Sequence, residues 1–112
     1  MTGLEFEKYV DSILRTKGYI NVRLTEKYDL GIDIIAIKDG ITWGIQVKRY
    51  SGLVKANAVR QVVTALKHYN CDRAMVITNS TFSNTAIKLS RSNKSILIDR
   101  RYFTSKINTG IN

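Results

Sequence analysis

The sequence predicts an α/β fold in which a mixed central β-sheet is flanked by helices, with the element order αβββαβαβ. Three β-type runs follow an opening helix, and the Asp39-Gly40 pair between the last two is typical of a tight hairpin. Helix and strand then alternate, which favours parallel pairing. Antiparallel pairing in the first half and parallel pairing in the second half together imply a mixed sheet.

The first half of the chain contains one helix and three strands. A helix is expected over residues 3–17, where apolar residues recur at helical spacing. A half-buried strand is expected over residues 19–25, because Ile20, Val22 and Leu24 alternate with polar residues. The runs 34–37 and 41–48 form the hairpin.

The second half of the chain alternates helices and strands. Its expected elements are a helix over residues 55–69, a strand over 73–78, a helix from the N-cap Ser83 to about Arg91, a strand over 95–98 and a short closing helix over 99–107. We expect residues 1–107 to form a single domain and residues 108–112 to form a loose tail.

The composition is typical of a globular protein of 112 residues, with 44% hydrophobic and 24% charged residues. No apolar run approaches the roughly 20 residues of a membrane span. The start of the sequence shows no signal-peptide pattern. The single cysteine, Cys71, excludes an internal disulfide and suits a small packing role in a reducing cytosol, so we expect a cytoplasmic protein.

The net charge of +9 is distributed unevenly along the chain. Residues 1–39 contain seven acids and six bases, whereas residues 40–98 contain nine bases and the single acid Asp72. Such a basic region favours a polyanionic partner such as DNA or RNA. The alternative is a basic surface that serves solubility.

Polar side chains gather at the open end of the expected hairpin. Gln46 and Lys48 are two residues apart on one strand, so they point to the same face. Asp33 opens the neighbouring strand near the same end. An acid, an amide and an amine therefore converge, which is the grouping that a metal-dependent phosphodiesterase needs. The alternatives are that Asp33 only starts a strand and that Lys48 is a solvated strand end.

Several segments together resemble a known family. In chain order they are Gly3-x-x-Phe6-Glu7, Gly18-Tyr19, Gly31-Ile32-Asp33-Ile34-Ile35-Ala36, Gln46-Val47-Lys48-Arg49-Tyr50, the helix with Gln61, Val76-Ile77-Thr78 with Phe82-Ser83, and Ile96-Leu97-Ile98-Asp99. They resemble the catalytic domain of Mrr-like restriction endonucleases, which belong to the PD-(D/E)xK nuclease superfamily. The resemblance covers nearly the whole chain.

The resemblance implies a restriction-endonuclease-like fold and an endonuclease that hydrolyses DNA phosphodiester bonds with Mg²⁺ or Mn²⁺. It implies that Asp33 is the metal ligand and that Lys48 orients or activates the attacking water. Gln46 occupies the place of the superfamily's second acid and matches the QxK variant. Glu7 resembles the first-helix acid that assists metal binding, and Gln61 resembles the helix residue that completes some of these sites. A homodimer is expected, because family members commonly cleave two strands with two sites.

Candidate DNA contacts follow the second hairpin strand. Arg49, Lys55 and Arg60 are candidate phosphate contacts, each of which is alternatively a plain surface residue. Tyr50 is a candidate for stacking on a base, and its alternative is a packing role on a β face. No segment corresponds to a DNA-recognition domain, so a separate targeting subunit is expected. Two other functions stay open: a structure-specific nuclease resembling a Holliday junction resolvase, and a catalytically silent DNA-binding or assembly subunit, which the neutral amide of Gln46 admits.

Overall fold

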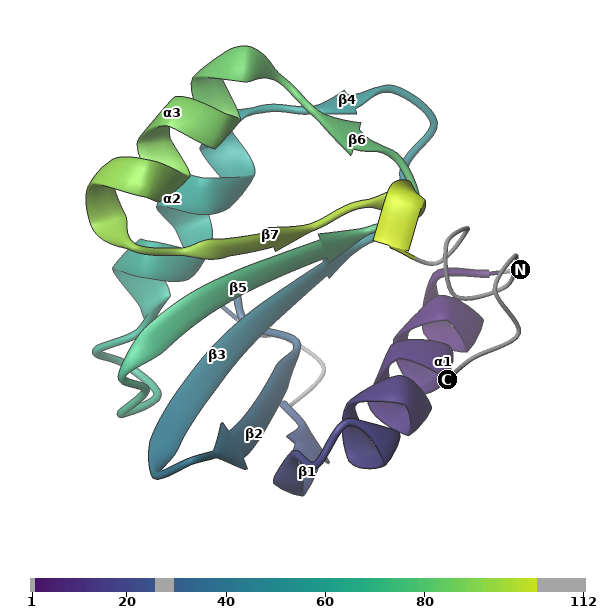
Figure 1. Ribbon diagram of the computed structural model, residues 1–112, viewed down its shortest axis with the longest axis vertical. Helices are drawn as coiled ribbons and strands as arrows, with labels where there is room; N and C mark the ends of the chain where they lie inside the picture. The colour runs from purple at the N-terminus through teal and green to yellow at the C-terminus, as the bar shows by residue number, and fades with distance from the viewer. Residues whose placement is uncertain (1, 26–29, 103–112) are drawn as a thin grey trace.

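A computed structural model describes residues 2–25 and 30–102 of the protein. In this part of the chain, five strands form one mixed sheet with helices on both faces (Figure 1). The predicted α/β class is confirmed, as is the predicted order of the longer elements. The elements are α1 (Gly3–Thr16), β1 (Ile20–Leu24), β2 (Ile34–Lys38), β3 (Ile41–Lys48), β4 (Leu53–Val54), α2 (Ala56–Ala65), β5 (Arg73–Thr78), β6 (Thr81–Phe82), α3 (Asn84–Asn93) and β7 (Ile96–Ile98).

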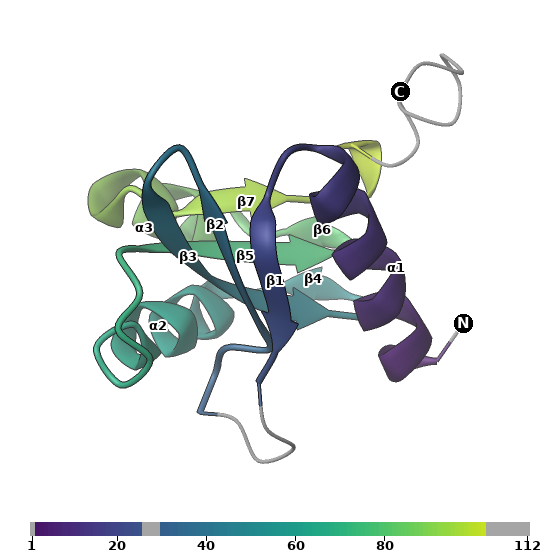
Figure 2. The same cartoon turned by 90° about the horizontal axis from the view of Figure 1, so that it is seen from below.

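Strand β3 lies at the centre of the sheet, whose strand order is β1-β2-β3-β5-β7. Strands β1, β2 and β3 pair antiparallel, whereas β3, β5 and β7 pair parallel. Helices α2 and α3 pack together on one face, and α1 covers the other, as Figures 1 and 2 show. Side chains of β3 therefore enter both layers in alternation.

The two faces of the sheet hold separate apolar clusters. On the α1 face, Val10 and Ile45 are almost completely buried. On the α2 face, Val59 and Val76 are buried to the same extent. Full burial of an aliphatic side chain contributes about 1.5–3 kcal/mol, so each layer stabilises the sheet independently.

The turn between β2 and β3 confirms the hairpin predicted from Asp39 and Gly40. Their φ angles are +53° and +78°. A type I′ turn needs positive φ at both central residues, which Asp tolerates and Gly adopts without strain. The pairing runs without a shift to Ile34 opposite Ile45, so Asp33 stands at the open end of the hairpin.

The predicted burial of β1 is wrong for two of its three apolar residues. Val22 is buried, but Ile20 and Leu24 are 59% and 41% exposed. The pairing with β2 shifts between Ile20 and Arg23, and Asn21 has a φ of +51°. An irregularity of this kind turns the following side chains away from strict alternation.

Helix α2 is shorter than the predicted range of residues 55–69. It ends at Ala65, and the N–H of Leu66 then donates to the carbonyl of Val63 in a tighter turn. Asn70 has a φ of +55°, which reverses the chain toward β5. Leu66 still packs against the core from this turn, so the apolar pattern continues beyond the helix that it predicted.

Helix α3 begins as predicted at the N-cap Ser83, whose Oγ accepts a hydrogen bond from the N–H of Ala86. It runs to Asn93, two residues beyond the expected end at Arg91. The following Lys94 has a φ of +59°, which stops the helix in a left-handed conformation.

Two local features were not predicted. Thr2 and Glu5 form a capping box at the start of α1, with reciprocal bonds between side chain and backbone. The Thr-x-x-Glu spacing is the known signature of this motif. Strands β4 and β6 pair in parallel over two residues each, which is too short for any sequence period to indicate.

Cys71 lies at the junction between α2 and β5, half-buried against the α2-face cluster. Burial raises the pKa of its thiol. A raised pKa lowers the fraction of reactive thiolate, which agrees with the predicted packing role.

Some predictions reach beyond the described residues. Residues 100–102 are helical, but the rest of the predicted closing helix and the predicted tail over residues 108–112 lie outside the described part of the chain. Among residues 2–25 and 30–102, no helix is both long enough and apolar enough to span a membrane.

Candidate active site

The open end of the β2–β3 hairpin brings Asp33, Gln46 and Lys48 to one cavity. Asp33 immediately precedes β2, and its backbone N–H donates to the carbonyl of Ile45 over 2.8 Å. The hairpin pairing is thus extended by one residue beyond β2. The cavity has a volume of about 430 Å³ and is lined by Leu30, Gly31, Asp33, Gln46, Val47, Lys48 and Gln61.

The carboxylate of Asp33 is held by the neighbouring strand. Its Oδ2 accepts a hydrogen bond of 2.7 Å from the backbone N–H of Val47. The backbone carbonyl of Asp33 instead accepts one of 2.9 Å from the N–H of Thr25. The side chain therefore acts as the acceptor that a strand carbonyl normally provides. A carboxylate has about four lone-pair sites, so this bond does not exhaust its capacity to bind a cation.

Gln46 is a buried amide with a fixed orientation, and it is only 6% exposed. Its Nε2 donates to the carbonyl of Gly31 and to Oε1 of Gln61, at 3.2 Å each. The Gly31 carbonyl can only accept, so this bond decides which end of the amide faces it. Among the described residues, Oε1 of Gln46 has no hydrogen-bond partner. Such a buried oxygen costs about 1–3 kcal/mol.

Gly31 allows α2 to approach the hairpin. Its φ is +109°, and a Cβ at this position would lie 2.9 Å from the backbone oxygen of Gln61. The positive φ strains any other residue at this position, and the short distance leaves no room for a side chain unless α2 moves. This close approach places Gln61 where it meets Gln46, so the glycine before Asp33 helps to assemble the cavity.

Lys48 lies at the carboxyl end of β3, next to Thr78 at the end of the parallel strand β5. In α/β sheets, ligands bind outside the carboxyl ends of parallel strands. Lys48 and Gln46 line the cavity together with Gln61 of α2, which confirms that the two β3 residues point to the same face. The side chain of Lys48 is half-buried there.

Glu7 lies on α1 and is not among the described residues that line this cavity. The start of α1 is nevertheless close to the loop that follows β3. Hydrogen bonds from Thr2, first from its backbone N–H and then from its side chain, lower the pKa of Glu5. The positive charge of Arg49 lowers this pKa further. The part of Glu7 in metal binding stays a prediction.

A second cavity of about 250 Å³ shares Lys48 and Gln61 with the first. The sequence did not predict it, because its walls come from a loop and a helix start without periodic pattern. Two of the predicted DNA contacts, Tyr50 and Lys55, line this cavity, whereas Arg49 and Arg60 are exposed and line neither cavity. Its other lining residues are Leu53, Val54, Asn57 and Ala58.

The donor set of the first cavity fits a hard cation. The described residues contain no group of three or more His, Cys, Asp and Glu side chains that could hold a metal ion. The cavity instead offers the carboxylate of Asp33 and the unpaired amide oxygen of Gln46. Mg²⁺ prefers oxygen ligands and usually keeps several waters, so two protein oxygens and a substrate oxygen suffice for it.

Comparison with known protein families identifies the family to which the chain belongs. The family model Mrr_cat, described as restriction endonuclease, matches residues 1–107. The chain belongs to this family. The resemblance predicted from the order of the motifs is thereby confirmed, and membership supports a nuclease domain. A search of the curated proteins finds no match.

Solved structures of restriction endonucleases share the fold of this family member. AspBHI, a DNA modification-dependent restriction endonuclease, matches with a TM-score of 0.75 and 16% identity over 96% of this chain and 31% of that chain. The MspJI restriction endonuclease, in complex with a 27-mer oligonucleotide, matches with a TM-score of 0.63 and 18% identity over 88% and 25%. A protein of unknown function, AF1548, matches with a TM-score of 0.73 and 17% identity over 84% and 56%.

These likenesses confirm the predicted restriction-endonuclease-like fold. At such low identity they establish the fold alone. The chain spans about half or less of the length of each of these proteins.

Proposed function

We propose that this family member is a metal-dependent DNA endonuclease that hydrolyses phosphodiester bonds. The observation that carries the proposal is the buried, unpaired Oε1 of Gln46 in one cavity with Asp33 and Lys48. A buried polar atom without a partner requires a reason, and a bound cation supplies one. A hairpin end that served only the fold would be more stable without it.

Asp33 and the Oε1 of Gln46 would hold a divalent cation such as Mg²⁺ or Mn²⁺, with Glu7 as a further predicted ligand. When bound, the cation would polarise the scissile phosphate and lower the pKa of water. Because the amide is neutral, Asp33 is the charged ligand of the pair that lines the cavity. This donor set favours one cation over two.

Lys48 supplies positive charge from the chain itself. Its ammonium group stabilises the negative charge that develops on the phosphate, and it holds the attacking water by a hydrogen bond. The water oxygen forms a bond to phosphorus while the bond from phosphorus to the leaving sugar oxygen breaks. The water proton passes to solvent, and the leaving oxygen takes up a proton from solvent. A preorganised group of this kind contributes about 3–4 kcal/mol to catalysis.

Gln61 acts through Gln46 as a positioning residue. It accepts a hydrogen bond from Nε2 of Gln46, and the carbonyl of Gly31 accepts a second one. With both acceptors on the Nε2 side, the Oε1 end of the amide is left for the cation. An amide therefore suits position 46, because a carboxylate would face the Gly31 carbonyl with no proton to donate.

DNA is the proposed substrate and partner. Residues 40–98 carry nine bases and one acid, and Arg49, Lys55 and Arg60 are exposed. Phosphate contacts by such residues make binding strongly dependent on salt. We further propose a homodimer, so that two cavities address two strands, and a separate subunit that supplies targeting. Light scattering of the purified chain tests the dimer.

Cleavage assays test the proposed function. Supercoiled, linear and branched DNA are incubated with Mg²⁺ or Mn²⁺ and with the wild type, Asp33→Asn, Lys48→Ala or the control Lys88→Ala, which changes an exposed lysine of α3. We expect cleavage by the wild type and the control alone. Equal cleavage by all four proteins would overturn the site assignment.

Two other outcomes identify the alternative functions. Cleavage restricted to four-way junctions would favour a structure-specific nuclease that resembles a Holliday junction resolvase. Salt-sensitive binding without cleavage of any substrate would favour a silent DNA-binding subunit.

A further inference from the structure

The second cavity lies between the loop after β3 and the first turns of α2. Its lining includes Val54 and Ala58, which are buried, and Tyr50 and Leu53, which are 54% and 51% exposed. Two large apolar side chains are thus partly open to solvent beside a polar cavity. The volume of about 250 Å³ is below the range of about 300–1,000 Å³ for drug-sized ligands and suits one small flat group.

The loop that carries Tyr50 is tied to the loop after β5. The N–H of Tyr50 donates to Oδ1 of Asn79 over 2.7 Å, and Oγ of Ser80 donates to the carbonyl of Gly52 over 2.6 Å. The Tyr50 ring also lies over Gly52, where a Cβ would be 3.3 Å from the ring carbon Cε2. The loop that carries the ring is therefore held in place before any ligand arrives.

The charge of the lining is positive. Lys48 and Lys55 contribute two cations, and no acid is among the residues that line the cavity. Within the described part of the chain, neither lysine forms an ion pair. Because Lys48 belongs to both cavities, a ligand that spans them carries its anionic group at the shared wall. The ligand is therefore anionic at one end and flat and apolar at the other.

We infer that the second cavity binds one nucleotide of DNA beside the scissile phosphate. Its base lies against Tyr50 and Leu53, the scissile phosphate lies at the shared wall by Lys48, and its other phosphate lies near Lys55. This inference rests on the proposed nuclease function and specifies its substrate. A base inside an intact duplex is stacked and does not reach such a cavity. Removal of a base from the stack costs least where the base is already unpaired, so the protein prefers DNA with an unpaired nucleotide next to the cleaved bond.

Equilibrium binding without divalent metal tests this pocket. The full chain is titrated with three fluorescent duplexes that differ at one central position: fully paired, with one extra unpaired nucleotide, or with an abasic residue in place of that nucleotide. Stacking on an aromatic ring strengthens binding, so we expect the unpaired nucleotide to bind about 10-fold more tightly than the other two.

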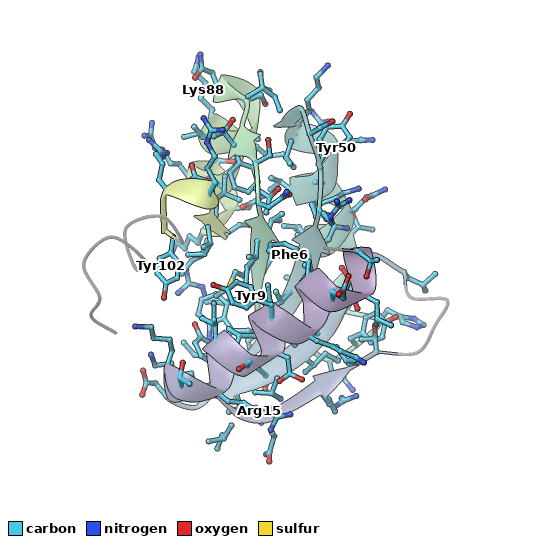
Figure 3. All side chains as sticks on the ribbon, turned by 90° about the vertical axis from the view of Figure 1, so that its right-hand side faces the viewer. Phe6, Tyr9, Arg15, Tyr50, Lys88 and Tyr102 are labelled. Carbon is cyan, nitrogen blue, oxygen red and sulfur yellow. The ribbon has the colours of Figure 1, made fainter. Side chains whose placement is uncertain are left out.

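Matched variants assign this preference to the pocket. Tyr50→Ala removes the preference and Tyr50→Phe retains it, because the ring is what the base contacts. Tyr9→Ala, on α1, leaves the preference unchanged (Figure 3). Lys55→Ala weakens the binding of all three duplexes by a similar factor and lowers the salt slope by about one, as loss of one phosphate contact does.

Equal affinity for the three duplexes would contradict the proposed nucleotide pocket. An equal effect of Tyr50→Ala on the binding of all three duplexes would contradict it as well. Cleavage of the same duplexes with Mg²⁺ separates this failure from that of the proposed function. Cleavage without a preference for the unpaired nucleotide would contradict the proposed nucleotide pocket and would still support the proposed nuclease function. The preference without any cleavage supports the pocket and argues against the nuclease.

Discussion

The two faces of β3 use alternate residues of one strand for opposite purposes. On the α1 face, Ile45 is fully buried within an apolar cluster. On the α2 face, Gln46 is buried with an unpaired oxygen, and Lys48 lines the same cavity. Ile45 stabilises the fold, whereas the buried oxygen of Gln46 lowers stability and keeps polar groups together. Substitutions at neighbouring residues of β3 should therefore have different effects: those on the α1 face should lower stability, and those on the α2 face should lower activity.

The largest effect is expected for Asp33→Asn on the polar side. Asn keeps an oxygen that accepts from the N–H of Val47, so the hairpin end is retained, but the negative charge is lost. We expect the nicking rate to fall by about 1,000-fold or more with little change in thermal unfolding. Asp33→Ala removes the hydrogen-bond acceptor as well, so it should lower both the nicking rate and the thermal stability. Activity of Asp33→Asn within tenfold of the wild type would show that Asp33 is structural.

Lys48→Met removes the ammonium group and keeps much of the length of the side chain. We expect kcat to fall by about 100- to 1,000-fold, because a preorganised charge is lost where negative charge develops. Stability should stay the same, since Lys48 is only half-buried. Single-turnover nicking and urea unfolding measure the two quantities. An unchanged kcat with weaker DNA binding would make Lys48 a binding residue instead.

Ile45→Ala tests the apolar face. Removal of a fully buried aliphatic side chain should lower the free energy of unfolding by about 2–5 kcal/mol. The nicking rate per folded molecule should not change, because Ile45 points away from the cavity. Urea unfolding and active-site titration give the two values. A parallel loss of activity in the folded fraction would mean that the two faces are coupled through the strand.

The smallest effect is expected for the pair Gln61→Met and Gln61→Glu. Met cannot accept the hydrogen bond from Nε2 of Gln46, and loss of an orienting partner lowers activity by about 10- to 100-fold. Glu keeps an acceptor oxygen, so this variant should retain most of the activity. A greater loss of activity in Gln61→Glu than in Gln61→Met would indicate that Gln61 donates a hydrogen bond to the substrate phosphate.

The hairpin and the pairing of site residues on one face were predictable because they depend on local rules. The Asp39-Gly40 turn has one favoured geometry, and alternation places Gln46 and Lys48 on the same side. Pairing of the two strands around this turn then predicted that Asp33 lies at the same end. Each of these inferences depends on one continuous hairpin segment and needs no contact with the rest of the fold.

The contacts that complete the site depend on long-range packing and were not predictable in this way. The bond from Gln46 to Gln61 joins residues 15 positions apart on different elements. The approach of α2 to Gly31 and the unpaired oxygen of Gln46 appear only when the helix is placed against the sheet. The prediction of which β1 side chains are buried was wrong for a related reason, because one positive φ at Asn21 changed the alternation of side chains along the strand.

The bond between the Val47 amide and the Asp33 carboxylate provides a spectroscopic reporter. Its N···O distance is 2.7 Å, so the proton resonance of this amide depends on the charge that the carboxylate carries. A cation that shares the Asp33 oxygens would withdraw electron density from this bond. Titration of the labelled chain with Mg²⁺ should therefore move the Val47 amide peak before peaks of the α1 face. Occupancy of the cavity becomes visible by nuclear magnetic resonance, with neither DNA nor cleavage.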